Sequence, residues 1–285
     1  MESGAPELIA ADLAPGDAAA RQFDWSALRV ARIRSPAHPL FDAVYDRLWR
    51  EFGDRGEMEQ RRAIEARLEW DPAQPIDQHA LRYEVLAVLR GEEIVGLRDH
   101  TAIAPCTAES GASPAGVVVH LSHVIVEPPL RGSGLAGWLR ALPIQAAREC
   151  ARAVGRPAND QITLVAEMEH PDGGTPAVMA RLRSYQRAGF LKIDPSAVAY
   201  RQPDFRPEHH IDATSLRPVP LALVVRRIGR EAEGWMSGAE VRAITAALYT
   251  MFGVHARADH MAPLWAALQH FPGPEERVAL CPPLQ

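Results

Sequence analysis

A short glycine-rich run is the part of this sequence whose residue types and spacing point most directly to chemistry. It consists of Arg131, Gly132, Ser133, Gly134, Leu135 and Ala136, and it lies between an apolar stretch and an amphipathic helix pattern. Glycines let main-chain N–H groups approach a ligand without a Cβ in the way, and the following helix adds its positive N-terminal end. The run therefore predicts a loop that binds the pyrophosphate of a nucleotide cofactor.

The same run allows a second interpretation, because Gly132–Gly137 formally matches the G-x-G-x-x-G pattern of dinucleotide-binding proteins. Those proteins place the glycines directly after a strand and a carboxylate about 20 residues further on. Here Pro128 and Pro129 separate the strand from the glycines. About 20 residues further on, where the carboxylate is expected after a strand, the sequence has a charged helix pattern. A nicotinamide dinucleotide is thus the weaker alternative.

The residues that flank the glycines indicate a different cofactor. The stretch Val126–Ala136 resembles the signature of the GNAT family of acyl-CoA-dependent N-acetyltransferases, a strand-ending Val and a Pro followed by Arg/Gln-x-x-Gly-x-Gly/Ala. Arg131, Gly134 and Ala136 fill the defining positions of that signature. A second signature of the family, an aromatic residue four positions before Gly-Phe, is similar to Tyr185–Phe190. The two signatures occur in the family's order, which strengthens the resemblance.

The resemblance implies that an acetyl group passes from acetyl-CoA to an amine by direct transfer, through a tetrahedral intermediate. It implies that the amides of residues 131–136 hold the cofactor and that Val124 and Val126 lie along its pantetheine arm. Tyr185 matches the family position whose phenol points at the cofactor sulfur, where it can donate a proton to the departing thiolate. The structural alternatives are an ordinary strand-to-helix turn for the glycines and a core tyrosine for Tyr185.

Several residues on two neighbouring strands are candidates for the general base that removes a proton from the amine. Glu167 and Glu169 share one strand face, and His120 and Ser122 share another. We rank Glu167 first because a glutamate in an apolar strand is costly unless it is used or paired, although histidine as a residue type titrates closer to neutral pH. His123 would reach the pocket only through a bulge in its strand. A satisfied core histidine and a solvent-facing carboxylate are the alternatives.

Two further patterns concern the acceptor side and metals. Tyr200–Pro203 looks like a Tyr-x-Gln-Pro element of some GNAT members and could line the acceptor site, although a plain turn is the favoured interpretation. His255 and His260 lack the i, i+4 spacing of a helical metal pair, so no metal site is predicted.

The composition is that of a globular protein, because 47% of the 285 residues are hydrophobic and 24% are charged. A net charge of −5 argues against a nucleic-acid partner. Three cysteines with neither metal nor disulfide spacing indicate a reducing compartment. No stretch approaches the ~18 apolar residues of a membrane span, and residues 1–25 lack a signal-peptide pattern. A cytoplasmic protein without a membrane partner is therefore expected.

Periodicity and the resemblance, which covers about residues 28–228, together predict an α/β (α+β) chain with the GNAT fold. We expect a mixed sheet of about six to seven strands flanked by helices, with a C-terminal helical extension. The expected divisions are a flexible tail at 1–25, the acyltransferase domain at 26–229 and the extension at 230–285. Strands are expected at 29–34, 83–89, 94–103, 117–126, 162–168 and 221–225, and helices at 39–52, 56–68, 135–150 with a bend at Pro143, 176–188, 238–253 and 261–268.

The sequence thus predicts an N-acetyltransferase that uses acetyl-CoA and a small-molecule or peptidic amine. The family also makes a homodimer a possible assembly. A non-catalytic acyl-CoA-binding sensor or scaffold of the same fold is the alternative, and it would be favoured if neither Glu167 nor His120 faces the thioester. The identity of the amine and the length of the acyl chain are left open.

Overall fold

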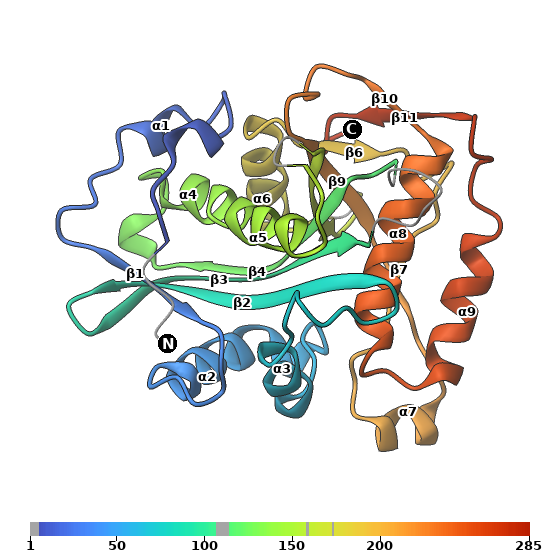
Figure 1. The fold of residues 1–285 in the computed structure, drawn as a ribbon, viewed down its shortest axis with the longest axis horizontal. Coiled ribbons are helices and arrows are strands. Elements are labelled where there is room, and N and C mark those ends of the chain that lie inside the picture. The colour runs from blue at the N-terminus through green and yellow to red at the C-terminus, as the bar shows by residue number, and fades with distance from the viewer. Residues whose placement is uncertain (1–5, 107–113, 158–159, 173) are drawn as a thin grey trace.

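A mixed sheet with helices on both faces organises the molecule (Figure 1). The computed structural model describes residues 6–106, 114–157, 160–172 and 174–285. Within these residues the sheet has nine strands in the order β1-β2-β3-β4-β5-β9-β6-β11-β10. These strands are β1 (Arg29–Ile33), β2 (His79–Arg90), β3 (Glu93–Pro105), β4 (Val117–Val126), β5 (Ile162–Met168), β6 (Leu191–Ile193), β9 (Ala222–Arg227), β10 (Trp235–Ser237) and β11 (Arg277–Cys281), and β7 (Arg201–Gln202) and β8 (Val219–Pro220) form a separate hairpin.

The helices form a layer on each side of this sheet. They are α1 (Ala18–Arg21), α2 (Phe41–Phe52), α3 (Arg61–Leu68), α4 (Leu135–Ala141), α5 (Ile144–Ala153), α6 (Pro176–Arg187), α7 (Glu208–Thr214), α8 (Gly238–Gly253) and α9 (Ala258–Leu268), with short 3-10 turns η1 (Ala10–Asp12), η2 (Gly53–Arg55) and η3 (Pro128–Leu130). Helices α2, α3 and α8 share one apolar core with the sheet, and α5 and α6 share another on the opposite face. The predicted α/β class is confirmed, and the sheet is larger than the six to seven strands expected.

Local sequence explains where several helices begin. The Thr175 hydroxyl oxygen accepts a hydrogen bond from the Val178 amide at 3.3 Å, and a proline occupies the first position of α6. Ser237 and Glu240 form the capping box that the sequence predicts at the start of α8. Pro143 does more than bend its helix, since α4 ends at Ala141 and α5 begins at Ile144.

Strands β4 and β5 run side by side for only part of their length. Their parallel pairing covers Val117–His120 on β4 and Ile162–Val165 on β5. Beyond His120, β4 continues along β3 to Val126, while β5 continues along β9 to Met168. The two strands therefore separate at their carboxyl ends and leave an opening in the sheet.

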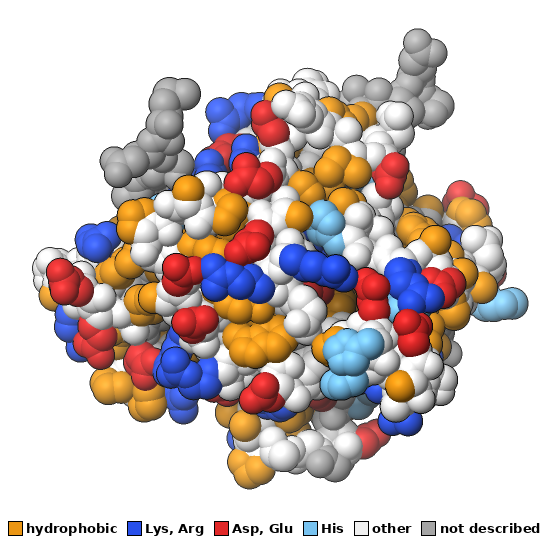
Figure 2. Space-filling view, turned by 90° about the horizontal axis from the view of Figure 1, so that it is seen from below, with side chains coloured by type: hydrophobic (Ala, Val, Ile, Leu, Met, Phe, Trp, Pro, Cys, Tyr) orange, Lys and Arg blue, Asp and Glu red, His pale blue; other side chains and the backbone are white. Residues whose placement is uncertain are grey.

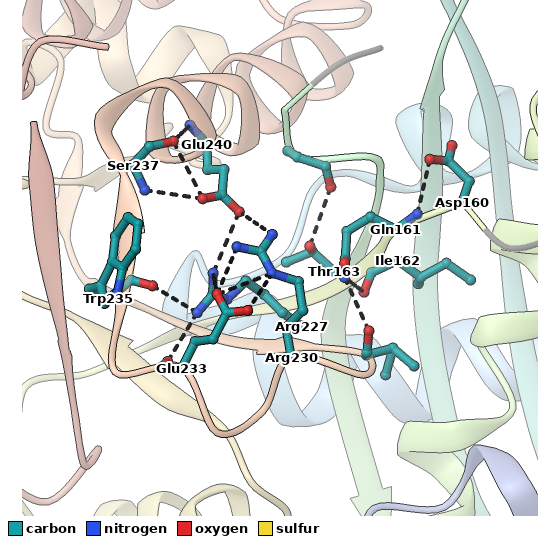
Figure 3. Close-up of polar contacts among 12 residues, drawn as sticks. Asp160, Gln161, Ile162, Thr163, Arg227, Arg230, Glu233, Trp235, Ser237 and Glu240 are labelled. Atoms are coloured by element: carbon teal, nitrogen blue, oxygen red, sulfur yellow. Dashed lines mark hydrogen bonds and ion pairs between the residues drawn. The ribbon is translucent and has the colours of Figure 1, made fainter. Parts of the chain in front are cut away.

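The sequence predicts a C-terminal extension made of helices, but the structure shows that it also contains strands. Strand β11 pairs with β6, and β10 pairs with β11, so the extension adds two strands to the sheet edge. Arg227 on β9 ties the extension to the sheet, because its guanidinium donates to the Trp235 carbonyl at 2.8 Å and pairs with Glu233 and Glu240 (Figure 3). Short edge strands of this kind have little periodicity, which is why sequence patterns miss them.

The N-terminal segment is packed where its composition predicts a loose tail. The indole N–H of Trp138 on α4 donates to the Ala20 carbonyl at 2.7 Å. Arg140 pairs with Asp17 at 2.8 Å, and Arg148 pairs with Asp12 at 2.6 Å. Residues 12–20 are thus attached to α4 and α5 by two ion pairs and a buried hydrogen bond.

Charged side chains on the face formed by α2 and α3 are intermixed in sign (Figure 2). Arg61, for example, pairs with Asp42 and with Glu65 on this face. None of the helices in the described ranges is both long and apolar enough to cross a bilayer.

Candidate active site

The glycine loop lies between η3 and the first turn of α4, and it borders a groove of about 660 Å³. We call this groove the loop groove; it is lined by residues 16–20, Val126, most of residues 130–137, Arg140, and Ala180, Ser184 and Arg187 of α6. Backbone φ is +78° at Gly132 and +105° at Gly134, a region in which side chains are strained. The sequence motif therefore corresponds to a loop that needs its glycines.

Several main-chain donors of the loop are available to a ligand. Among the described residues, none accepts a hydrogen bond from the amides of Gly132, Gly134 and Ala136. Ser133 and Leu135 do not line the groove, because the Ser133 hydroxyl donates to the Leu130 carbonyl at 2.7 Å and Leu135 is fully buried. Free N–H groups at a helix start are the usual components of a phosphate site.

Helix α1 packs directly against this loop. A methyl group added at Gly134 would lie 2.4 Å from the backbone of Ala19, and one added at Gly137 would lie 2.7 Å from the Ala20 Cβ. The Asp17 carboxylate, which pairs with Arg140, lies at the same end of α4. The N-terminal segment therefore forms one wall of the loop groove, a feature that its alanine-rich sequence does not reveal.

A second cavity of about 270 Å³ opens where β4 and β5 separate, and we call it the polar cavity. It is lined by parts of η2, β4, β5, α6, β7 and α8. The structure brings all of the predicted catalytic candidates and one predicted cofactor contact to this cavity, namely His120, His123, Glu167, Glu169, Tyr185 and Val124. The other predicted strand contact, Val126, lies in the loop groove instead.

His120 and Glu167 face each other across the two strands just where they begin to part. The His120 Nε2 atom lies 3.0 Å from a Glu167 carboxylate oxygen, and the His120 Nδ1 atom lies 3.1 Å from the hydroxyl of Ser122. Burial alone would raise the pKa of Glu167, but hydrogen bonds from its neighbours outweigh burial and lower it. Glu167 is therefore an ionised carboxylate that orients the imidazole of His120.

Two more donors fix Glu167, and they come from the segment for which a plain turn was favoured. The Tyr200 hydroxyl donates to Glu167 at 2.6 Å, and the Gln202 amide donates to it at 2.9 Å. Tyr249 stacks on Tyr200 with ring centroids 5.7 Å apart and donates its own hydroxyl to the Arg201 carbonyl at 3.1 Å. Tyr200 and Gln202 lie more than 30 residues from Glu167 in the chain, so no local sequence pattern predicts that they contact it.

His123 reaches the polar cavity through a bulge, as its place in the strand requires. The β3–β4 register shifts between Arg98 and His100, so that Asp99 lies opposite the bulge. The His123 ring donates from Nδ1 to Asp99 at 3.1 Å and from Nε2 to the Glu57 carbonyl at 2.9 Å. With both ring nitrogens donating, His123 has no free lone pair for a proton.

The charge states of this pair follow from their mutual contact. Burial would lower the pKa of His123, but the charge of Asp99 and its hydrogen bonds raise it to about 9. Burial would raise the pKa of Asp99, but the charge of His123 and its hydrogen bonds lower it to about 2. The pair is therefore a buried ion pair at neutral pH, and it anchors the bulge of β4 to the segment that follows η2.

Tyr185 and Glu169, the remaining two catalytic candidates, both line the polar cavity next to α6. The Tyr185 hydroxyl is buried at the cavity wall and accepts a hydrogen bond from Arg98 at 3.2 Å. Glu169 is half exposed and pairs with Arg181 at 2.6 Å. Sequence reasoning did not single out Arg98, because it lies among other charged residues in an ordinary hairpin strand.

Within the part of the chain that the structure describes, no three His, Cys, Asp or Glu side chains form a group that could bind a metal ion.

Comparisons with known proteins find structural neighbours only. No protein-family model matches the chain, and no curated protein matches it. One similar solved structure is an aminoglycoside acetyltransferase from an uncultured soil metagenomic sample in complex with trehalose, at 11% identity and TM-score 0.35, covering 58% of this chain and 90% of that one.

Two further solved structures bear the GNAT name. One is a GNAT family acetyltransferase from Elizabethkingia anophelis with acetyl-CoA bound, at 11% identity and TM-score 0.34, covering 70% of this chain and 97% of that one. The other is an acetyltransferase of the GNAT family from Streptococcus pneumoniae, at 16% identity and TM-score 0.26, covering 51% of this chain and 66% of that one.

Proposed function

We propose that this chain is an N-acetyltransferase that moves the acetyl group of acetyl-CoA directly to an amine. The proposal rests on the adjacency of the two cavities along β4 and α6. Val126 lines the loop groove and Val124 lines the polar cavity, while on α6 Ser184 borders the groove and Tyr185 the cavity. A ligand held by its phosphates at the loop can thus place its reactive end beside Tyr185.

The residues of the loop groove fit such a cofactor. The free amides of Gly132, Gly134 and Ala136 would hold its pyrophosphate at the start of α4. The separated ends of β4 and β5 give an extended arm a path between the groove and the cavity. When bound, the thioester would supply an activated acyl group. The chain's own residues would remove the proton of the amine and donate a proton to the departing sulfur.

For the proton of the amine, the geometry supports a relay that ends at His120. The ionised carboxylate of Glu167 accepts the Nε2 proton of His120, which leaves the Nδ1 lone pair facing the Ser122 hydroxyl. Ser122 can accept a proton from the amine while it passes its own proton to His120. Glu167 ranked first as the base by sequence, but three hydrogen bonds stabilise its charge and weaken it as a base. We therefore assign it the role of orienting His120.

Tyr185 also lines the polar cavity, and we assign it the donation of a proton to the departing sulfur. The cavity wall also carries the carboxylates of Glu57, Glu59 and Glu169 together with Arg55 and Arg181. These carboxylates pair with Arg55, Arg67 and Arg181, so the choice of an amine, on a small molecule or on a peptide, rests on the family resemblance.

The test is release of free thiol from acetyl-CoA by the purified protein with a panel of primary amines. His120→Gln should lower kcat about 100-fold, because general-base assistance typically contributes that much or more. His79→Gln is the matched control, since His79 lies outside both cavities and should retain full activity. Binding of acetyl-CoA without thiol release for any amine would favour the sensor alternative and overturn the proposal.

A further inference from the structure

Arg98 on β3 is the most unusual charged side chain near the polar cavity. It is fully buried, and its Nη2 group donates to the Tyr185 hydroxyl oxygen at 3.2 Å. Its Nε and Nη1 groups have no hydrogen-bond partner among the described residues. A guanidinium that is buried with unused donors is strongly unfavourable unless it serves an anion.

Other buried arginines of the chain show the usual solution. Arg67 pairs with Glu59, Arg140 with Asp17 and Arg156 with Asp160. Described residues provide no such ion pair for Arg98. The adjacent carboxylate, Asp99, feels its charge, but its oxygens accept hydrogen bonds from His123 and Tyr83 instead. The positive charge of Arg98 is thus directed at Tyr185.

The contact also determines where the phenol proton points. A guanidinium has donors only, so the Tyr185 oxygen must accept in this hydrogen bond. The Tyr185 proton then lies in another direction, and no described residue accepts it. Since Tyr185 lines the polar cavity, that direction is the cavity. A second guanidinium, that of Arg140, lies over the Tyr185 ring at 5.5 Å from its centroid.

We propose that Arg98 is a positioning residue for Tyr185, aiming the phenol proton into the polar cavity and neutralising the phenolate that forms when this proton leaves. The proposal rests on the acetyltransfer proposed above. As the tetrahedral intermediate collapses, the C–S bond breaks with its electron pair passing to sulfur. The Tyr185 O–H bond breaks as the S–H bond forms, so the thiol leaves neutral and the phenolate lies beside Arg98. The proton that the amine gave up, returned through water, restores the phenol.

A double-mutant cycle tests this role. Arg98→Met and Tyr185→Phe should each lower kcat, the first by about 10- to 100-fold. In the Tyr185→Phe background, Arg98→Met should cause less than a threefold further loss, because its effect passes through the missing hydroxyl. An undiminished loss in that background would show that Arg98 acts only on the fold, and it would overturn the proposal.

Readouts other than turnover separate a positioning role from a packing role. The Kd for acetyl-CoA, measured by calorimetry, should change less than threefold in Arg98→Met, and Arg98→Lys should recover part of kcat. Arg156→Met is the matched control, because it also removes a buried guanidinium but should leave kcat unchanged. A kcat loss in the control equal to that in Arg98→Met would also overturn the proposal.

The same assays distinguish this proposal from the function on which it rests. If the unaltered protein releases no thiol with any amine, acetyltransfer itself fails, and the role of Arg98 fails with it. If the unaltered protein turns over and the cycle is additive, only the role of Arg98 is refuted.

Discussion

The buried His123–Asp99 pair should make the stability of the protein fall as the solution becomes alkaline. The pKa of His123 is raised from its ordinary 6.5 to about 9 in the folded chain. Below pH 6.5 the histidine is protonated in both states, and the pair contributes fully. Between pH 6.5 and 9 the unfolded chain loses this proton while the folded chain keeps it, so stability is lost with rising pH.

The size of the effect follows from that difference. One pKa unit corresponds to about 1.4 kcal/mol, so the pair contributes on the order of 3 kcal/mol at pH 6.5 and little above pH 9. Asp99→Asn keeps the shape of the side chain but removes the charge. The variant should be less stable than the parent by a similar amount at pH 6.5, and this deficit should shrink toward pH 9.

The assay is urea unfolding followed by tryptophan fluorescence at a series of pH values from 6.5 to 9. Cys150 also contributes near the top of this window, because its thiol ionises near pH 9 in the unfolded chain while burial raises its pKa to about 12 in the folded chain. This contribution is the same in both proteins and cancels in the difference. A free-energy difference between parent and Asp99→Asn that stays constant across the window would show that the pair is not coupled to proton binding.

Three further tests use substitutions at the glycine loop, at the donors near Glu167 and at the start of α8. Gly134→Ala should weaken acetyl-CoA binding by at least tenfold in calorimetry, because its Cβ would meet the backbone of Ala19. Gly132→Ala has no atom within 4 Å of its Cβ and should cost only about 1 kcal/mol of backbone strain, measured by thermal melts. Tyr200→Phe removes a donor to the buried Glu167 and should lower kcat, while Tyr249→Phe should not; equal kcat values in the two variants would contradict this. Removing the α8 cap with Ser237→Ala should cost about 1 kcal/mol in urea unfolding, without a change in kcat.

The parts of the site that the sequence predicts are those built from neighbouring residues. The glycine loop is specified by backbone requirements within six residues, and the capping box of α8 by residues three apart. Strand alternation predicts that His120 shares a face with Ser122 and Glu167 with Glu169, but it does not predict that His120 and Glu167 meet. Alternation also shows that His123 needs a bulge to reach the cavity, but the bulge itself is known only from the register of β3 and β4.

The parts that the sequence does not predict depend on contacts between distant segments. Tyr200 and Gln202 reach Glu167 through the fold of the loop before β9, and β11 joins the sheet only after α8 and α9 have brought the chain back. Arg98 is followed by Asp99 and His100, so its strand resembles a solvated one in sequence. The burial of Arg98 and its contact with Tyr185 of α6 appear only in the folded chain.

We propose that the loop groove and the polar cavity together hold an acyl-CoA. The most direct test is a calorimetric titration of the purified protein with acetyl-CoA, with NADH as the control ligand for the dinucleotide alternative. We predict micromolar binding of acetyl-CoA and no measurable binding of NADH. Absence of acetyl-CoA binding, or tighter binding of NADH, would contradict the assignment of the loop and the acetyltransferase function built on it.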